Sequence, residues 1–300
     1  MRIASVSKAF SGAVALSLVD RGLLSLDDTI GARLPALPAA WGSVTLRQLL
    51  SHTGGVSNYT EDEGFQQYFG DHLQDDITLL GLIDFVRDEP LEFAPGTGYR
   101  YSNTDNIIIA LMAEAVTGTP YVDLLKREVA RPLDLRQTAL PRGVNVPKPL
   151  IRGYDTLPEI EDLTECCSMA FVSASGGIYS TPHDLTRFTQ GYVGGELYGA
   201  ATRAAQFSFR PGAGSEPPGP GKQSGGLALF RYKTRCGTVF GHTGNFPGYA
   251  QFTAATRNGK RALTVSVNRQ LAPDAPGIKA PEAFKVLRRD YTLAVCALLN

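Results

Sequence analysis

Up to about position 190, most apolar residues of the chain lie at the spacing of α-helices. Apolar residues that recur every three or four positions line one face of a helix. The pattern predicts helices over 5–21, 45–51, 78–88, 105–117, 121–130 and 181–190. Gly22 and Gly118 follow two of these segments and are typical helix-ending residues. The first half of the chain is therefore expected to consist of helices and loops.

The pattern changes beyond position 210. Residues 210–226 are rich in Pro, Gly and Ser and predict a long surface loop. Four extended segments follow, at 227–232, 238–242, 249–256 and 262–268. Asn258-Gly259 between the last two is a strong hairpin signal, and an amphipathic helix is expected over 281–299.

This order of elements predicts an α+β fold, in which an antiparallel sheet is flanked by helices and accompanied by an all-helical region. The helical part, about 23–185, would be inserted between the first helix and the C-terminal strands. There is no repeat of fixed period and no clear linker, so a single domain over 1–300 is expected.

Composition narrows the class of protein. Hydrophobic residues make up 43% of 300 residues and charged residues 19%, enough for a sizeable core. Lys+Arg and Asp+Glu are both 29, and this balance argues against a general nucleic-acid binder, which needs a basic surface. No segment reaches the ~18 uninterrupted apolar residues of a membrane helix; the best candidate, 107–116, is broken by Glu114.

The N-terminal segment has two interpretations. Arg2 and Lys8 before the apolar run 9–19 resemble a short signal peptide. The same residues also suit a helix that starts near Ser5 and ends at Gly22. The segment alone does not separate the two.

Ser5-Val6-Ser7-Lys8 places a hydroxyl and an amine three residues apart at the start of the predicted helix. At this spacing both side chains lie on one face, so Lys8 can accept the proton of Ser5. Partial burial and the positive end of the helix dipole would both lower the lysine pKa. The four-residue pattern alone is common by chance.

Two further motifs carry polar side chains suited to catalysis. In Tyr101-Ser102-Asn103, the phenol could relay a proton and the Asn amide could bind a carbonyl. An ordinary turn before a helix is the alternative. His242-Thr243-Gly244 ends a predicted strand, where Gly244 permits close approach of a substrate and the amide of Asn245 could stabilise an oxyanion.

A second copy of the last motif, His52-Thr53-Gly54, follows a helix rather than a strand. We therefore assign this copy a structural role, with His52 as a packing or loop-bracing residue.

Together, and in this order, the three motifs resemble those of the serine penicillin-recognising enzymes. The similarity is to the branch that holds class C β-lactamases, secreted D-Ala-D-Ala carboxypeptidases and related esterases. It extends from Arg2 to the C-terminal helix and includes the connecting segments 49–55 and 176–181. The resemblance favours the helix over the signal peptide at 9–19.

The resemblance implies a role for each motif residue. Ser5 would be the acylated nucleophile, Lys8 its general base and Tyr101 a proton carrier. Asn103 would contact Lys8 and the acyl amide of the substrate. The strand side of the site would be lined by His242, Thr243 and Gly244, and the backbone amides of Ser5 and Asn245 would form the oxyanion hole. Ser7 and Ser102 are assigned to helix and turn formation.

The same resemblance implies a disulfide between Cys236 and Cys296, although two buried free thiols remain the alternative. Cys166 and Cys167 are adjacent, and adjacent cysteines rarely pair. They are expected to be core or site-rim thiols rather than metal ligands, because no further ligand has suitable spacing. No metal or cofactor is expected.

Two departures from the family pattern stand out. Where the carboxypeptidases have an arginine for the substrate carboxylate, this chain has Phe230. Its neighbour Arg231 would point to the opposite face of the strand; Arg235 or Arg269 are possible substitutes. The family also has an N-terminal helix and strands before the nucleophile, whereas only four residues precede Ser5 here. One sheet edge is then expected to be unpaired.

The sequence thus predicts a serine hydrolase that works through an acyl-enzyme, most similar to a D-Ala-D-Ala carboxypeptidase or a β-lactamase. The alternatives are a carboxylesterase acting on small esters and a truncated, inactive homologue that only binds ligands. The expected partner is a peptide, β-lactam or ester substrate, with no nucleic acid and a monomeric state. The resemblance implies a secreted or periplasmic protein, with no signal peptide within this sequence. A lipid- or partner-binding module has no support beyond the apolar helices, which suit a core.

Overall fold

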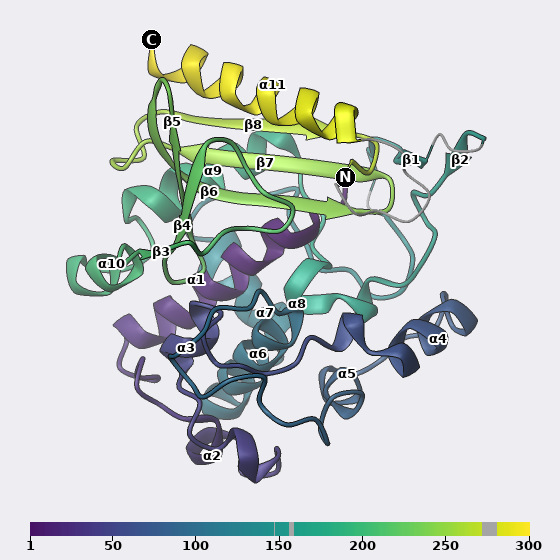
Figure 1. Ribbon diagram of the computed structural model, residues 1–300, viewed down its shortest axis with the longest axis vertical. Coiled ribbons are helices and arrows are strands. Elements are labelled where there is room, and N and C mark those ends of the chain that lie inside the picture. Colours follow the sequence, from purple (N-terminus) through teal and green to yellow (C-terminus); the bar gives the residue numbers. More distant parts are fainter. Residues whose placement is uncertain (147, 156–158, 272–280) are drawn as a thin grey trace.

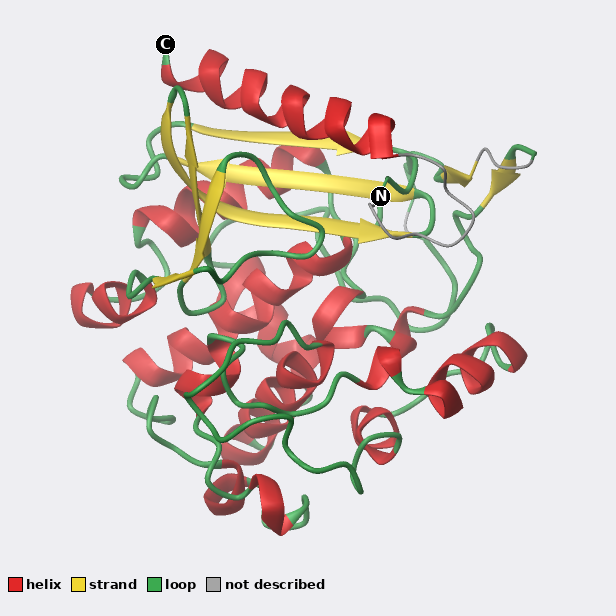
Figure 2. Ribbon diagram, in the orientation of Figure 1, coloured by secondary structure: helices red, strands yellow, loops and turns green. Residues whose placement is uncertain are grey.

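A six-stranded antiparallel sheet lies across one end of the molecule, and most of the helices lie below it (Figures 1 and 2). The computed structural model describes residues 1–146, 148–155, 159–271 and 281–300. The sheet strands follow one another in chain order: β3 (Arg210–Pro211), β4 (Lys222–Gly225), β5 (Phe230–Thr234), β6 (Gly237–Phe246), β7 (Tyr249–Ala255) and β8 (Ala262–Val267). A separate pair, β1 (Tyr154–Asp155) and β2 (Glu161–Asp162), lies to one side.

The four predicted strands and the hairpin at Asn258-Gly259 are confirmed. The prediction of one continuous loop over 210–226 was wrong at both ends. Lys222–Gly225 pairs with β5, and Arg210–Pro211 pairs in turn with β4. Backbone hydrogen bonding to a neighbouring strand creates these short strands, and their Pro/Gly-rich composition gives no signal for it.

The helices confirm the predicted α+β class. They are α1 (Ser7–Asp20), α2 (Ile30–Arg33), α3 (Leu46–Leu50), α4 (Glu63–Asp71), α5 (Leu79–Asp84), α6 (Asn103–Thr117), α7 (Tyr121–Leu125), α8 (Ser173–Gly176), α9 (Pro182–Gly194), α10 (Ala200–Gln206) and α11 (Pro281–Leu299). Shorter turns are η1 (Ala4–Val6), η2 (Ala39–Trp41), η3 (Tyr59–Glu61), η4 (Lys126–Ala130, a π-helical turn) and η5 (Met169–Phe171).

Several helix limits differ from the predictions. The first helix begins at Ser7, because Ser5 lies in the preceding 3₁₀ turn. The helix predicted over 78–88 ends at Asp84, and that over 121–130 changes to π-helical geometry at Lys126. Helices α2, α4, α8 and α10 were not predicted.

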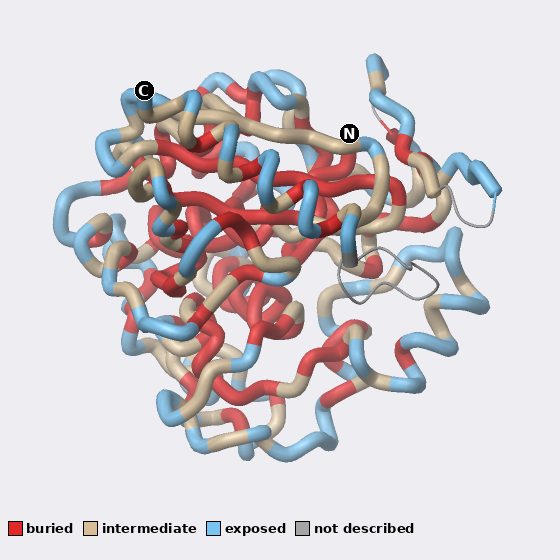
Figure 3. Tube along the Cα trace, turned by 45° about the horizontal axis from the view of Figure 1, so that its top comes forward, coloured by how far each residue is buried: buried red, intermediate tan, exposed pale blue. Residues whose placement is uncertain are grey.

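The two faces of the sheet are covered by different helices (Figure 1). On one face, α11 packs over a cluster that includes Tyr232, Phe252 and Tyr291. On the other face, α9 and the central helix α1 join the main core, where the buried residues concentrate (Figure 3). Helix α1 is buried on all sides from Ser7 to Leu18. The apolar run 9–19 is therefore a core helix, as the resemblance implied.

Strand β8 lies at one edge of the sheet and pairs only with β7 among the described residues. No single described helix is both long and apolar enough to cross a membrane. Among the described residues, α6 and the segment Tyr121–Ala130 reach that length and apolar composition only when taken together, and the chain bends by 88° between them.

Candidate active site

Ser5 lies in the η1 turn, where the chain passes beside strand β6. Ala4 has φ of 50°, the left-handed region, so the turn presents Ser5 just before α1 begins. Gly244 of β6 faces this turn: a Cβ atom there would lie 2.4 Å from the carbonyl oxygen of Ile3 and 3.2 Å from the backbone nitrogen of Ser5. Only glycine permits this approach. It brings the strand motif and the serine motif into contact.

Lys8 lies one turn further along and is held by three acceptors. Its Nζ lies 3.1 Å from Ser5 Oγ, 2.6 Å from Asn103 Oδ1 and 2.9 Å from the carbonyl oxygen of Ser175. Burial lowers the pKa of the Lys8 amine to about 7, although the charge of Glu216 raises it in part. Near neutral pH a large share of Lys8 is therefore the free amine.

The three contacts also orient this amine. In the neutral form, two N–H groups donate to the oxygens of Asn103 and Ser175, both of which are pure acceptors. The lone pair then occupies the remaining direction, toward Ser5. The geometry allows Lys8 to accept the proton of the Ser5 hydroxyl.

Asn103 begins α6, and its amide is fixed by two residues that the sequence analysis did not single out. Its Nδ2 donates to Asn58 Oδ1 at 3.2 Å and to Thr60 Oγ1 at 3.0 Å, and its backbone N–H donates to the same Asn58 oxygen at 3.0 Å. The side-chain oxygen is thereby turned toward Lys8, as expected. The expected contact between Asn103 and a substrate amide stays a prediction.

Tyr101 is buried beside these residues, with the Lys8 ammonium 4.9 Å above the centre of its ring. Burial raises the pKa of Tyr101 well above its ordinary value, and the nearby Ser5 hydroxyl offsets this only in part. The phenol oxygen makes no well-aligned hydrogen bond among the described residues. Tyr101 is therefore a neutral phenol, able to pass on a proton.

His52 has the structural position that the sequence analysis expected. Its Nδ1 lies 2.7 Å from Asp105 Oδ2 in the core, and its ring lies 4.7 Å from that of Tyr101. Burial lowers the pKa of His52 and raises the pKa of Asp105, each well beyond its ordinary range. The pair therefore holds one shared proton without net charge, and it braces the ring of Tyr101.

The strand side of the site is more deeply buried than expected. His242 is 1% exposed, its Nδ1 donates to the carbonyl oxygen of Thr243 at 2.6 Å, and its ring packs 4.9 Å from that of Phe230. Burial lowers its pKa to about 3, so the ring is neutral. The hydroxyl of Thr243 donates to the carbonyl oxygen of Pro217 at 2.7 Å. A loop around Pro217 thus covers this part of β6.

Beside Ser5 lies a cavity of about 490 Å³. Ser5, Asn103 and Asn245 are among the polar residues that line it. The walls are largely aromatic and are formed by Phe65, Phe69, Phe171 and Phe246. The first three rings pack on one another, with centroids 5.1–6.2 Å apart. The shape suits a small substrate with an apolar group.

Residues 1–287 match the Beta-lactamase family. This chain belongs to the β-lactamase family. Among curated relatives, it is 23% identical over 290 residues to penicillin-binding protein 4* of Bacillus subtilis (strain 168), covering 89% of this chain and 60% of that protein. It is 29% identical over 259 residues to esterase EstB of Burkholderia gladioli, covering 73% of this chain and 64% of the esterase. The chain thus spans under two thirds of either relative's length.

Solved structures agree with this assignment. A D-stereospecific amidohydrolase from Streptomyces sp. superposes with a TM-score of 0.82 at 29% identity, covering 92% of this chain and 84% of that one. The predicted β-lactamase/transpeptidase-like fold is therefore confirmed.

In this β-lactamase-family chain, neither Arg231 nor Arg235 lies where the carboxylate-binding arginine was expected. Phe230 is buried against His242 there. Arg231 extends to the opposite face, where it donates to Ser224 Oγ at 2.9 Å and lies over the ring of Phe209. Arg235 lies in the turn before β6, about 25 Å along the strand from Gly244. Arg269 directly precedes Gln270, which lines the cavity.

The cysteines divide as predicted. Cys236 and Cys296 form a disulfide that ties the start of β6 to α11, with Cα atoms 5.1 Å apart. Cys166 and Cys167 are free thiols at the rim of the core. No cluster of metal-ligating side chains occurs among the residues that the structure describes.

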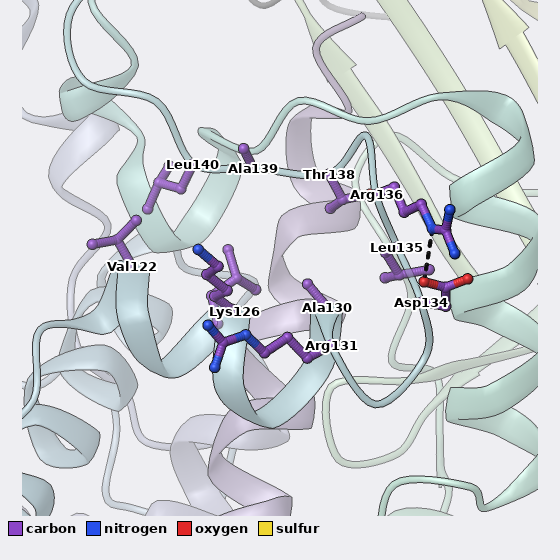
Figure 4. Close-up of a pocket in the computed structure, with 11 residues that line it drawn as sticks. Val122, Lys126, Ala130, Arg131, Asp134, Leu135, Arg136, Thr138, Ala139 and Leu140 are labelled. Atoms are coloured by element: carbon purple, nitrogen blue, oxygen red, sulfur yellow. Dashed lines mark hydrogen bonds and ion pairs between the residues drawn. The ribbon is translucent and has the colours of Figure 1, made fainter.

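A second cavity, of about 530 Å³, lies between η4 and the segment 134–140 (Figure 4). Lys126 and Arg131 flank its apolar floor, and Asp134 pairs with Arg136 at one end. Its lining holds no serine, cysteine or histidine. Nothing in it suits the chemistry of the Ser5 site.

Proposed function

We propose that this chain is a serine hydrolase that works through an acyl-enzyme on Ser5. The observation that supports this most strongly is the Ser5–Lys8 pair, in which a buried amine of pKa about 7 lies 3.1 Å from the hydroxyl. A base whose pKa is close to the working pH is effective in proton transfer. Ser5 of this pair lines the cavity with the aromatic walls.

In the proposed acylation, Ser5 Oγ attacks the substrate carbonyl carbon while the Lys8 amine takes the hydroxyl proton. The backbone N–H groups of Ser5 and Asn245 would stabilise the oxyanion. The tight packing of Gly244 against the η1 turn supports their placement side by side. The bond to the leaving group then breaks.

The leaving group needs the proton that Lys8 accepted. We assign Tyr101 as the relay, because its raised pKa keeps the phenol protonated and its ring lies against both Ser5 and Lys8. Water then attacks the acyl-enzyme with Lys8 as its base, and Ser5 regains its proton. Asn245 of β6 lines the cavity and would border the substrate, whereas His242 and Thr243 are buried and would brace the strand.

We propose small esters or amides with an apolar or aromatic group as the substrate class. Four phenylalanines line the cavity, whereas Phe230 replaces the arginine that a carboxypeptidase uses for a terminal carboxylate. The similarity to proteins named as an esterase, EstB, and as a D-stereospecific amidohydrolase supports this class. D-Ala-D-Ala peptides and β-lactams are the second candidate, supported by the similarity to penicillin-binding protein 4*.

Covalent labelling tests the proposal. The protein is incubated with a fluorescent penicillin or a chromogenic ester, and the adduct is located by mass spectrometry. We expect an acyl group on Ser5, absent in Ser5→Ala. Ser7→Ala is the matched control, because Ser7 is a buried neighbour whose hydroxyl only accepts from the N–H of Ile178; it should still be labelled at Ser5. Well-folded protein without an adduct would contradict the proposal and support an inactive, ligand-binding homologue.

Substrate class is tested separately. Turnover of phenyl esters and D-amino-acid amides is compared with release of D-alanine from a D-Ala-D-Ala peptide. We expect the uncharged substrates to be preferred by kcat/KM. Faster release of D-alanine would favour the carboxypeptidase, with Arg269 as the candidate carboxylate partner.

We also propose that the protein works in an oxidising, secreted or periplasmic compartment as a monomer. The Cys236–Cys296 disulfide supports the compartment, because such bonds persist outside the reducing cytosol. Gel filtration with light scattering measures the oligomeric state.

A further inference from the structure

Arg2 is a fully buried cation next to the active-site turn, with 0% exposure. Its Nε donates to the hydroxyl of Tyr179 at 2.8 Å, and its Nη2 donates to the carbonyl oxygen of Cys167 at 3.1 Å. No ion pair between Arg2 and a carboxylate occurs in the described part of the chain. A buried charge is costly unless a partner of opposite sign neutralises it. A negative partner for Arg2 must therefore come from an acidic group other than a carboxylate.

Two thiols lie next to the Arg2 guanidinium. Nη1 of Arg2 lies 3.4 Å from the sulfur of Cys166 and 3.4 Å from the sulfur of Cys167. The two sulfurs are 3.0 Å apart. Hydrogen bonding from Cys167 and the charge of Arg2 lower the pKa of Cys166 to about 7, while Cys167 is shifted in the opposite direction. Cys166 is therefore the more acidic of the two thiols, and both lie beside the arginine.

The two cysteines differ in access. Cys167 is completely buried, whereas Cys166 is partly exposed and lines a cavity of about 310 Å³ at the surface. Two bases, Lys148 and Arg152, and two acids, Asp162 and Glu165, line the same cavity, and Arg152 pairs with Asp162. This cavity shares no lining residue with the cavity beside Ser5. A small reagent could therefore reach Cys166 without entering the catalytic site.

We propose that Cys166 and Cys167 form a reversible redox site, in which small-molecule disulfides convert the thiol pair to a vicinal disulfide. The Cys166 thiolate attacks one sulfur of the reagent R–S–S–R, giving a mixed disulfide and one RS⁻. Cys167 then loses its proton and attacks the Cys166 sulfur, which releases the second RS⁻. Overall the two cysteines lose two electrons and the one thiol proton carried by Cys167, and the two RS⁻ take up that proton and one from solvent to become two RSH. This site is independent of the hydrolase proposal.

The bond is expected to be easily reduced. Adjacent Cα atoms are 3.8 Å apart, below the usual 4.4–6.8 Å range for disulfides. Strained disulfides have higher reduction potentials and serve as labile or regulatory bonds. This same strain explains why adjacent cysteines rarely pair in a purely structural role.

Oxidation of Cys166 and Cys167 would affect the active site through Arg2. The disulfide removes the thiolate, so the buried guanidinium loses its negative partner. Arg2 lies three residues before Ser5, and its charge also lies 5.2 Å from the ring of Phe246, which lines the catalytic cavity. We therefore expect the oxidised form to melt at a lower temperature and to have a less ordered η1 turn.

Peptide mapping tests the site without relying on activity. The full chain is exposed to oxidised glutathione, and remaining thiols are alkylated. Trypsin then releases 153–187, which contains both cysteines and no other. We expect this peptide to be unalkylated and lighter by two hydrogens. Mild dithiothreitol should restore both thiols while the Cys236–Cys296 bond stays intact, which makes that bond an internal control.

Single variants separate the steps. Cys167→Ser should stop at a stable mixed disulfide on Cys166, whereas Cys166→Ser should react far more slowly. Arg2→Met should slow the reaction of Cys166 at pH 7, because removing the cation lowers its thiolate fraction, but by less than Cys166→Ser does, since the hydrogen bond with Cys167 remains. If Arg2→Met does not fold, the two cysteine variants still decide the question.

Three outcomes would overturn the proposal. They are two alkylatable thiols after treatment, a glutathione adduct that persists in the wild-type chain, and a disulfide between two molecules. Because the mapping reads mass alone, these results are distinct from a failure of Ser5 to be acylated.

Discussion

Replacing Gly244 by alanine should separate the strand motif from the nucleophile without removing any polar side chain of the site. The new Cβ would lie 2.4 Å from the Ile3 carbonyl oxygen, and 3.2 Å from both the Ala4 Cβ and the Ser5 nitrogen. Heavy atoms in van der Waals contact are about 3.5 Å apart. The strand and the η1 turn must therefore move apart by about 1 Å.

The turn has little freedom to yield. Ile3 is fully buried, and its N–H donates to the carbonyl oxygen of Ile178 at 3.0 Å. The displacement therefore falls on β6, and it moves the amide of Asn245 relative to that of Ser5. A misplacement of about 1 Å can reduce catalysis about 10²-fold, and the loss of one oxyanion donor costs about 10²–10³ in kcat. We expect kcat to fall by about 10²-fold or more.

The assay is steady-state hydrolysis of a chromogenic ester, with thermal melting followed on the same samples. Gly70→Ala is the matched control, because Gly70 lies in exposed helix α4 with no atom within 4 Å of its added Cβ. It should retain activity and gain up to about 1 kcal/mol in stability. If Gly244→Ala keeps kcat within about threefold of the wild type, the contact does not position the oxyanion hole and the reasoning fails. Activity per folded molecule, from burst titration, separates this effect from unfolding.

Three further outcomes are expected. The value of kcat/KM should rise with pH through about 7 and then level off, because only the free amine of Lys8 accepts a proton; a profile that is flat across about pH 5 to 9 would show that Lys8 is not the base. Phe69→Ala should raise KM about tenfold for an aromatic acyl ester and little for an acetyl ester, because it removes one apolar wall; equal changes would show that the cavity does not bind the acyl group. Replacing Cys236 and Cys296 together by serine should cost about 4 kcal/mol in urea unfolding, since the bond closes a loop of 60 residues; an unchanged midpoint would show that the bond adds no stability.

Local signals in the sequence identified most of the regular elements. Apolar spacing located α1, α6 and α9, and Asn258-Gly259 located the β7–β8 hairpin. The signals were weaker where structure depends on neighbours. Strand β4 exists because it pairs with β5, and the first residues of the expected helix form a 3₁₀ turn because β6 packs on them.

The site shows the same division. The motifs predicted that Ser5, Lys8, Tyr101 and Asn103 are site residues, and the structure brings these side chains together. Ser175 contributes only a carbonyl oxygen, which any residue type could supply. Motif spacing therefore carried no signal for it.

Covalent order and side-chain chemistry are properties of the sequence itself. They determined which helices could form, which residues could act as nucleophile and base, and that position 230 carries no positive charge. Burial is a property of the packed chain. It lowers the pKa of Lys8 to about 7, and it places the Arg2 guanidinium beside two thiols in a core that excludes water. The chemistry proposed for both sites depends on that exclusion, which only the tertiary structure provides.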